Sequence, residues 1–139
     1  MTVHIIKLCV GIDSVDHLLL MRKRDPRNKG KDYNFHITRY KPKRAEEILN
    51  GGSLYWVIKG SVLVRQKVIG FEPVETDKGT KCMIKMDKEI HLTEIQPRRP
   101  FQGWRYFEDN AVPKDLPKGQ KHSDIPAEMS SELKALGLI

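Results

Sequence analysis

Two apolar runs at the centre of the chain, joined by a two-residue turn, constrain its fold most strongly. Residues 54–58 (LYWVI) are continuously apolar, which is typical of a strand covered on both faces. Lys59-Gly60 follows, and residues 62–71 form a second strand-like run, so the pair predicts a β-hairpin. Tyr55 and Trp56 point to opposite faces of the first run, and we expect one of them in the core.

The rest of the chain predicts further strands and a few short helices. The strands are expected where apolar residues alternate or cluster, at residues 3–12, 33–40, 81–86, 90–95 and 101–107. Asp13 or Ser14 predicts the start of a helix that reaches about Arg24. Pro42 and Gly51 bracket a second, shorter helix.

A third helix is predicted near the end of the chain. Asp124 is a suitable cap for it, and the apolar residues that follow recur at helical spacing. These residues are Ile125, Met129, Leu133 and Leu136. The sequence therefore predicts an α+β fold: a bent, mainly antiparallel sheet or a small open β-barrel, with about three short helices. At 139 residues we expect a single domain, 1–139.

Composition favours a soluble cytoplasmic protein. Charged residues make up 31% of the chain, and no apolar run approaches the roughly 18 residues that a membrane span needs. The N-terminus lacks the pattern of a secretory signal peptide. Cys9 and Cys82 lie in apolar, strand-like runs, and we expect two buried, reduced thiols. Neither belongs to a CxxC pair, and the five histidines show no metal-ligand spacing, so we expect no metal or cofactor.

The net charge of +7 is concentrated in one block. Residues 22–44 contain ten Lys and Arg and two Asp, a local net charge of +8, whereas the rest of the chain is nearly neutral. Part of this block ends the first predicted helix, where cations complement the helix dipole. The block therefore predicts either a solvated surface or a site for phosphate or an acidic partner.

Residues 97–107 (PRRPFQGWRYF) form the second unusual segment. They hold three arginines and four of the ten aromatic residues of the chain. Trp104 and Tyr106 share one face of the predicted strand, while Arg105 faces the other way. Guanidinium groups and aromatic rings bind phosphates, carboxylates and flat rings. The segment predicts a recognition surface, although ion pairs that fix a loop would explain its arginines too.

Nearly the whole chain resembles an alphaproteobacterial family of uncharacterised proteins. The resemblance rests on HIIKLCVGIDSV, GGSLYWVIKG, VRQKVIGFE, QPRRPFQGWRYF and ELKALGLI. It implies a bacterial cytosolic protein of one domain and no particular activity. The order of a short helix at 42–50, a Gly-Gly pair and two strands also resembles the PUA-like barrels, including the ASCH and EVE groups. Those domains mostly bind RNA or modified bases in a cleft lined by aromatic and basic residues.

Taken together, these features predict a non-catalytic module that binds RNA or another single-stranded nucleic acid, with no catalytic residues. The predicted contacts are basic and aromatic: Arg39, Lys41, Lys43, Arg44, Arg65, Lys67, Arg98, Arg99, Trp104 and Arg105. One alternative is a small enzyme for an anionic metabolite that uses Glu72, Glu94 or a histidine for proton transfer. Another is an interaction module for an acidic protein partner.

Overall fold

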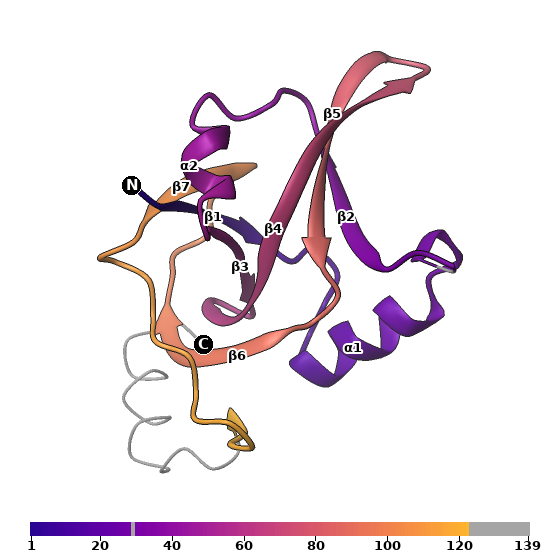
Figure 1. The fold of residues 1–139 in the computed structure, drawn as a ribbon. Coiled ribbons are helices and arrows are strands. Elements are labelled where there is room, and N and C mark those ends of the chain that lie inside the picture. The colour runs from indigo at the N-terminus through magenta and orange to yellow at the C-terminus, as the bar shows by residue number, and fades with distance from the viewer. Residues whose placement is uncertain (29, 123–139) are drawn as a thin grey trace.

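The computed structural model describes residues 1–28 and 30–122, which form a bent sheet with helices along its margins (Figure 1). The elements follow in chain order as β1 (Val3–Leu8), α1 (Val15–Arg24), the 3-10 helix η1 (Pro26–Asn28), β2 (Tyr33–Thr38), α2 (Ala45–Leu49), β3 (Ser53–Ile58), β4 (Ser61–Thr76), β5 (Gly79–Asp87), β6 (His91–Pro97) and β7 (Trp104–Glu108). The predicted third helix lies outside the described residues.

The seven strands form one sheet in the order β2-β5-β4-β3-β1-β7, and β6 also pairs with β4. The predicted hairpin is confirmed as β3 and β4, which turn at Lys59-Gly60. All strand pairs are antiparallel except β1 and β3, which are parallel. The long connection between these two strands, through α1, β2 and α2, makes the parallel pairing possible.

Strand β4 gives the sheet its bend. Its first part, residues 61–67, pairs with β3, and its second part, residues 68–76, pairs with β5. The register shifts between Val68 and Gly70, and such bulges increase the local bend and twist. The edge strands β2 and β7 do not pair with each other, so the described sheet is open, and the expectation of a bent α+β sheet is confirmed at that level.

The two described α-helices begin and end close to their predicted limits. Ser14 is the N-cap of α1, and its side-chain oxygen accepts a hydrogen bond from the His17 N–H. Helix α2 ends before Gly51, whose φ of 88° is the left-handed conformation that glycine adopts readily. The backbone of the next residue, Gly52, packs so closely against β1 that a side chain there would clash with the Val3 carbonyl oxygen.

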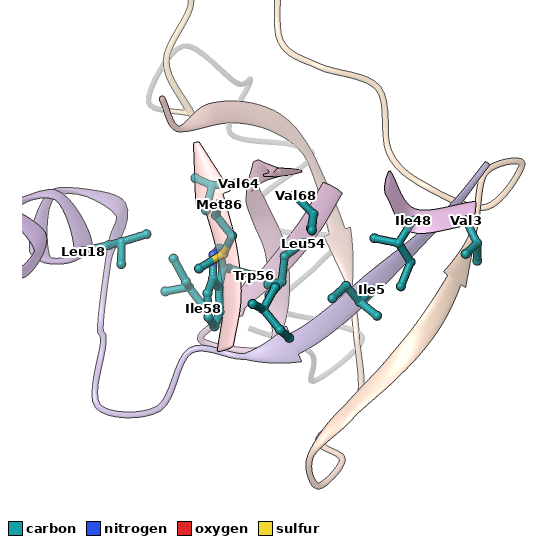
Figure 2. Close-up of a cluster of buried hydrophobic side chains, with 11 residues drawn as sticks. Val3, Ile5, Leu18, Ile48, Leu54, Trp56, Ile58, Val64, Val68 and Met86 are labelled. Carbon is teal, nitrogen blue, oxygen red and sulfur yellow. The ribbon is translucent and has the colours of Figure 1, made fainter. Parts of the chain in front are cut away.

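Hydrophobic side chains pack on both faces of the central strands. One cluster joins side chains of β1, β3, β4 and β5 to Leu18 of α1 and Ile48 of α2 (Figure 2). A smaller cluster on the other face contains Tyr55 and Phe107. Tyr55 and Trp56 are both buried, on opposite faces, so β3 is covered on both sides as its apolar run predicts.

Candidate nucleic-acid interface

A cleft of about 730 Å³ opens where the end of β1 meets α1, η1, β2 and β3. Its volume lies within the range of small-molecule sites. Three aromatic or imidazole side chains, four cations and one carboxylate contribute to its lining. These residues are Phe35, His36, Trp56, Lys7, Arg22, Arg24, Arg27 and Asp25. Apolar side chains of α1 and of the loop after β1 complete the wall.

Trp56 is held in place by a buried chain of hydrogen bonds. Its indole N–H donates to the Gln66 side-chain oxygen at 3.0 Å. The Gln66 amide in turn donates to the Asn34 side-chain oxygen and to the Asp87 carbonyl, both at 2.9 Å. Gln66 is fully buried, so this chain joins β2, β3, β4 and β5 beneath the cleft.

The Arg22 guanidinium has no carboxylate partner among the described residues. It lies 5.5 Å from the centroid of the Trp56 ring, within cation–π range. The Arg22 side chain is half-buried, and this burial lowers its pKa. A half-buried cation without a counter-ion is costly, and an anionic ligand in the cleft would offset that cost.

The nearest carboxylate to Arg22 along the chain is already engaged. Asp25 accepts hydrogen bonds from the Arg27 guanidinium at 2.8–3.1 Å, and these bonds lower the pKa of Asp25 to about 2. Arg24 and Lys7 form no ion pair within residues 1–28 and 30–122. The cleft therefore carries an excess of positive charge beside its aromatic rings.

The other titratable groups of the cleft are neutral at pH 7. Burial is the main cause that lowers the pKa of His36 to about 4, and the charges of Lys7 and Arg22 contribute. Burial raises the pKa of the Cys9 thiol to about 11. A neutral imidazole, a protonated thiol and an ionised Asp25 are poorly matched to proton transfer near neutral pH.

His36 should make the protein less stable as the pH falls from about 6.5 to about 4. In this range the unfolded chain takes up a proton on His36 while the folded chain does not, because the folded pKa is about 4. The free energy of unfolding therefore decreases by up to about 3 kcal/mol, and below pH 4 His36 adds no further change. Urea titrations at several pH values in this range should show that the free energy of unfolding falls with pH in the wild type and falls less in His36→Gln. Equal slopes in the two proteins would contradict the assignment.

Two of the predicted phosphate contacts, Arg44 and Arg65, are held by carboxylates. Arg44 pairs with Glu47 at 2.8 Å and with Glu108 at 2.7 Å, and these bonds raise its pKa. Arg65 forms two hydrogen bonds with Asp115, at 2.8 and 2.7 Å. An incoming phosphate would have to displace these carboxylates.

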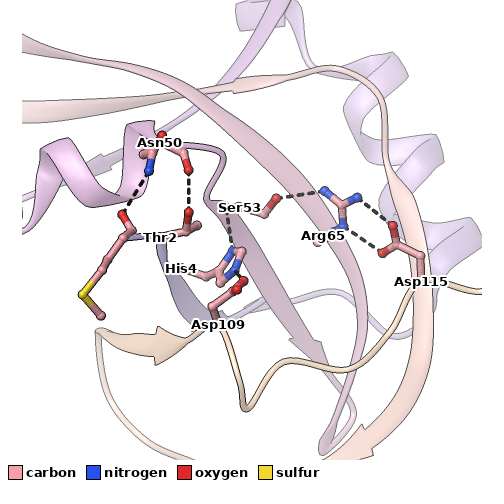
Figure 3. A network of polar contacts seen from close by, with 8 residues as sticks. Thr2, His4, Asn50, Ser53, Arg65, Asp109 and Asp115 are labelled. Carbon is pink, nitrogen blue, oxygen red and sulfur yellow. Dashed lines mark hydrogen bonds and ion pairs between the residues drawn. The ribbon is translucent and has the colours of Figure 1, made fainter.

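The bonds of Arg65 belong to a network that fixes the segment after β7 to the sheet (Figure 3). Arg65 also donates to the Ser53 hydroxyl, and the Ser53 N–H donates to His4 Nδ1. The other ring nitrogen of His4 contacts Asp109 at 2.7 Å. These hydrogen bonds give the buried His4 and Arg65 of β4 a structural role that requires no ligand.

The remaining predicted cations of the first block and of β4 are exposed. Arg39 stacks on Tyr40 at 5.5 Å, and Lys41 and Lys43 line a shallow hollow of about 370 Å³ before α2. Lys67 is exposed on β4 opposite Ser53. These positions are accessible to a ligand but do not line the cleft.

Two of the three arginines of residues 97–107 lie over aromatic rings of the face opposite the cleft. Arg98 lies 5.6 Å from the Phe101 centroid and 5.5 Å from that of Phe107, and Arg105 lies 5.3 Å from that of Phe101. Arg99 is exposed. Trp104 is half-buried and faces the other way, edge-on to Tyr106 at 5.0 Å.

The 22–44 block contacts the 97–107 segment at Tyr106, and Lys7 of β1, which belongs to neither segment, lies between the cleft and Trp104. Lys7, which lines the cleft, lies directly opposite Trp104 in the β1–β7 ladder. The Arg44 guanidinium lies 5.3 Å from the Tyr106 ring, and the Arg44 backbone N–H donates to the Tyr106 hydroxyl at 3.1 Å. Trp104 and Tyr106 of the 97–107 segment therefore lie on the same face of the sheet as the cleft, whereas Arg98 and Arg105 lie over aromatic rings of the other face.

None of the described residues that line the cleft belongs to the site predicted from the sequence. Arg22 and Arg24 were accounted for by their place at the end of α1, and Lys7 by its place in a strand. The signal that identifies Arg22 is its place in the last turn of α1 together with its contact with the Trp56 ring of β3. It depends on contacts between distant residues, which no single segment reveals.

Comparison with known proteins places the chain in a family but assigns no activity. No curated protein and no solved structure shows a significant match. Within residues 1–28 and 30–122, no helix combines the length and apolarity needed to cross a membrane. The model of the family described as protein of unknown function (DUF1489) matches residues 5–139, nearly the full length. The chain is therefore a member of the DUF1489 family.

Proposed function

We propose that the protein binds single-stranded RNA, or another single-stranded nucleic acid, by taking one base into the cleft beside Trp56. The observation that carries this proposal is the half-buried guanidinium of Arg22, which lies over the Trp56 ring and has no carboxylate partner among the described residues. Aromatic rings stack on bases of any sequence, and cations along the same groove bind the phosphates. The resemblance to PUA-like barrels points to the same class of ligand.

The charge of the cleft favours binding over catalysis. Four cations and one ionised carboxylate line it, and that carboxylate is bound by Arg27. A proton-transfer enzyme needs a group whose pKa lies near the working pH. His36, Cys9 and Asp25, with pKa values of about 4, 11 and 2, do not meet that need. Two free thiols fit a reducing, cytoplasmic setting for this role.

Binding should weaken steeply as salt increases. Each phosphate contact on a single strand contributes about −0.7 to the log–log slope of affinity against salt concentration. Arg24 is exposed at the cleft and has no ion-pair partner in the described part of the chain, so Arg24→Ala should weaken binding and flatten the slope by about 0.7. Fluorescence anisotropy with a labelled single-stranded decaadenylate at several salt concentrations measures both quantities.

Lys78 provides a matched control for this experiment. It is exposed in the turn between β4 and β5, outside the cleft, and Lys78→Ala removes the same charge. We expect Lys78→Ala to bind as the wild type does. The proposal fails if the wild type does not bind at low salt, or if both variants change the slope equally.

A further inference from the structure

A row of three side chains crosses the sheet beside the cleft. Lys7 of β1 lies opposite Trp56 of β3 on one side and opposite Trp104 of β7 on the other. Directly opposed residues of neighbouring strands place their side chains on the same face of the sheet. Trp56 and Trp104 both pack with the cluster on that face, so Lys7 stands between two indole rings.

The two tryptophans differ in exposure. Trp56 is buried, at 4% exposure, and contributes to the lining of the cleft, whereas Trp104 is half-buried. Trp104 contacts Tyr106 edge-on at 5.0 Å, an arrangement that leaves the two rings nearly perpendicular, at 81°. Tyr106 in turn is fixed by the Arg44 backbone N–H and guanidinium. Tyr106 therefore packs against one side of the Trp104 ring, and Arg44 fixes Tyr106 in position.

Among the described residues, no carboxylate pairs with Lys7, so its ammonium group can bind a ligand anion. Its side chain is only half-buried. Lys7 itself belongs to the lining of the cleft. A single cation between two aromatic sites matches the charge pattern of two neighbouring nucleotides joined by one phosphate.

We infer that Trp104 is a second base-binding site, so that the surface takes at least a dinucleotide whose linking phosphate lies on Lys7. This inference rests on the proposed role of the cleft as the first site. The backbones of β3 and β7 lie two strand spacings apart, roughly 10 Å. Single-stranded regions with splayed bases present successive rings to separate aromatic side chains in this way.

Three ligands distinguish binding at one site from binding at both: adenosine monophosphate, the dinucleotide pApA and decaadenylate. The wild type should bind pApA more tightly than the monophosphate. Trp104→Ala should weaken pApA and the decamer by roughly 5- to 150-fold, the range measured for loss of one stacked base, and leave the monophosphate within about twofold. Trp104→Phe keeps a stacking ring and should retain most of the affinity. Because the chain has two tryptophans, quenching by pApA should be smaller in Trp104→Phe than in the wild type.

Lys7→Gln tests the linking phosphate. It should flatten the salt slope for pApA by about 0.7, whereas Lys78→Ala should not. The inference is overturned if the wild type binds pApA no better than the monophosphate, or if Trp104→Ala and Trp104→Phe leave the decamer unaffected. It is also overturned if Trp104→Phe, with an unchanged melting temperature, weakens both short ligands equally. If the wild type binds none of the three ligands at low salt, the proposed function of the cleft fails as well.

Discussion

Replacement of Gln66 by leucine should lower the free energy of unfolding by about 3–5 kcal/mol. The Gln66 amide accepts from the Trp56 indole and donates to Asn34 and Asp87, and the residue is fully buried. Leucine has a similar size but leaves these groups without partners in the interior. Unfilled buried donors and acceptors cost about 1–3 kcal/mol each. Equilibrium urea unfolding measures the change.

Gln96→Leu is the matched control for this substitution. The Gln96 amide, on a half-buried residue of β6, donates one solvent-exposed hydrogen bond, to the Ala111 carbonyl. Loss of one such bond should cost about 1 kcal/mol. A cost for Gln66→Leu no larger than that of the control would show that the buried chain does not hold the sheet together under the cleft.

Replacement of Arg22 by alanine should weaken the binding of adenosine monophosphate and of decaadenylate by about 2–3 kcal/mol, or 30- to 150-fold. Its guanidinium is the half-buried cation of the cleft and has no carboxylate partner in the residues described. The stability of the free protein should change by less than about 1 kcal/mol, because the lost cation–π contact is offset by relief of the unpaired charge. Isothermal titration and urea unfolding measure the two effects.

Arg22→Lys separates charge from shape. Lysine keeps the positive charge but cannot form the two parallel hydrogen bonds of a guanidinium. Its affinity should fall between those of the wild type and Arg22→Ala. A large loss of stability with unchanged affinity in Arg22→Ala would identify Arg22 as a structural residue and contradict its role in the cleft.

Local pattern was sufficient to predict the elements of the central sheet. The apolar run of β3, the Lys59-Gly60 turn and the capping Ser14 each specify their structure through nearby residues, and all three are confirmed. The parallel pairing of β1 with β3 was not predicted. It depends on how a long connection folds back, and alternation along one strand carries no information about its partner.

The site was harder to predict because it is built from distant residues. The sequence did not show whether the 22–44 block adjoins the 97–107 segment; in the structure Arg44 contacts Tyr106, and Lys7 lies opposite Trp104 at the cleft. It did not indicate Arg22 or Trp56 as a pair, since 34 positions separate them in the chain. Arg44 and Arg65 looked like free cations in sequence, yet Glu47, Glu108 and Asp115 neutralise them.

The most direct test of the cleft is the pair of indole N–H signals in a ¹⁵N-labelled sample. The chain has two tryptophans, so each signal reports one site, and Trp104→Phe assigns them. On titration with adenosine monophosphate, the Trp56 signal should shift, because its N–H is held by Gln66 beneath the cleft, while the Trp104 signal stays in place. With decaadenylate both signals should shift. Saturation of the protein by decaadenylate without a shift of the Trp56 signal would contradict a base-binding role for the cleft.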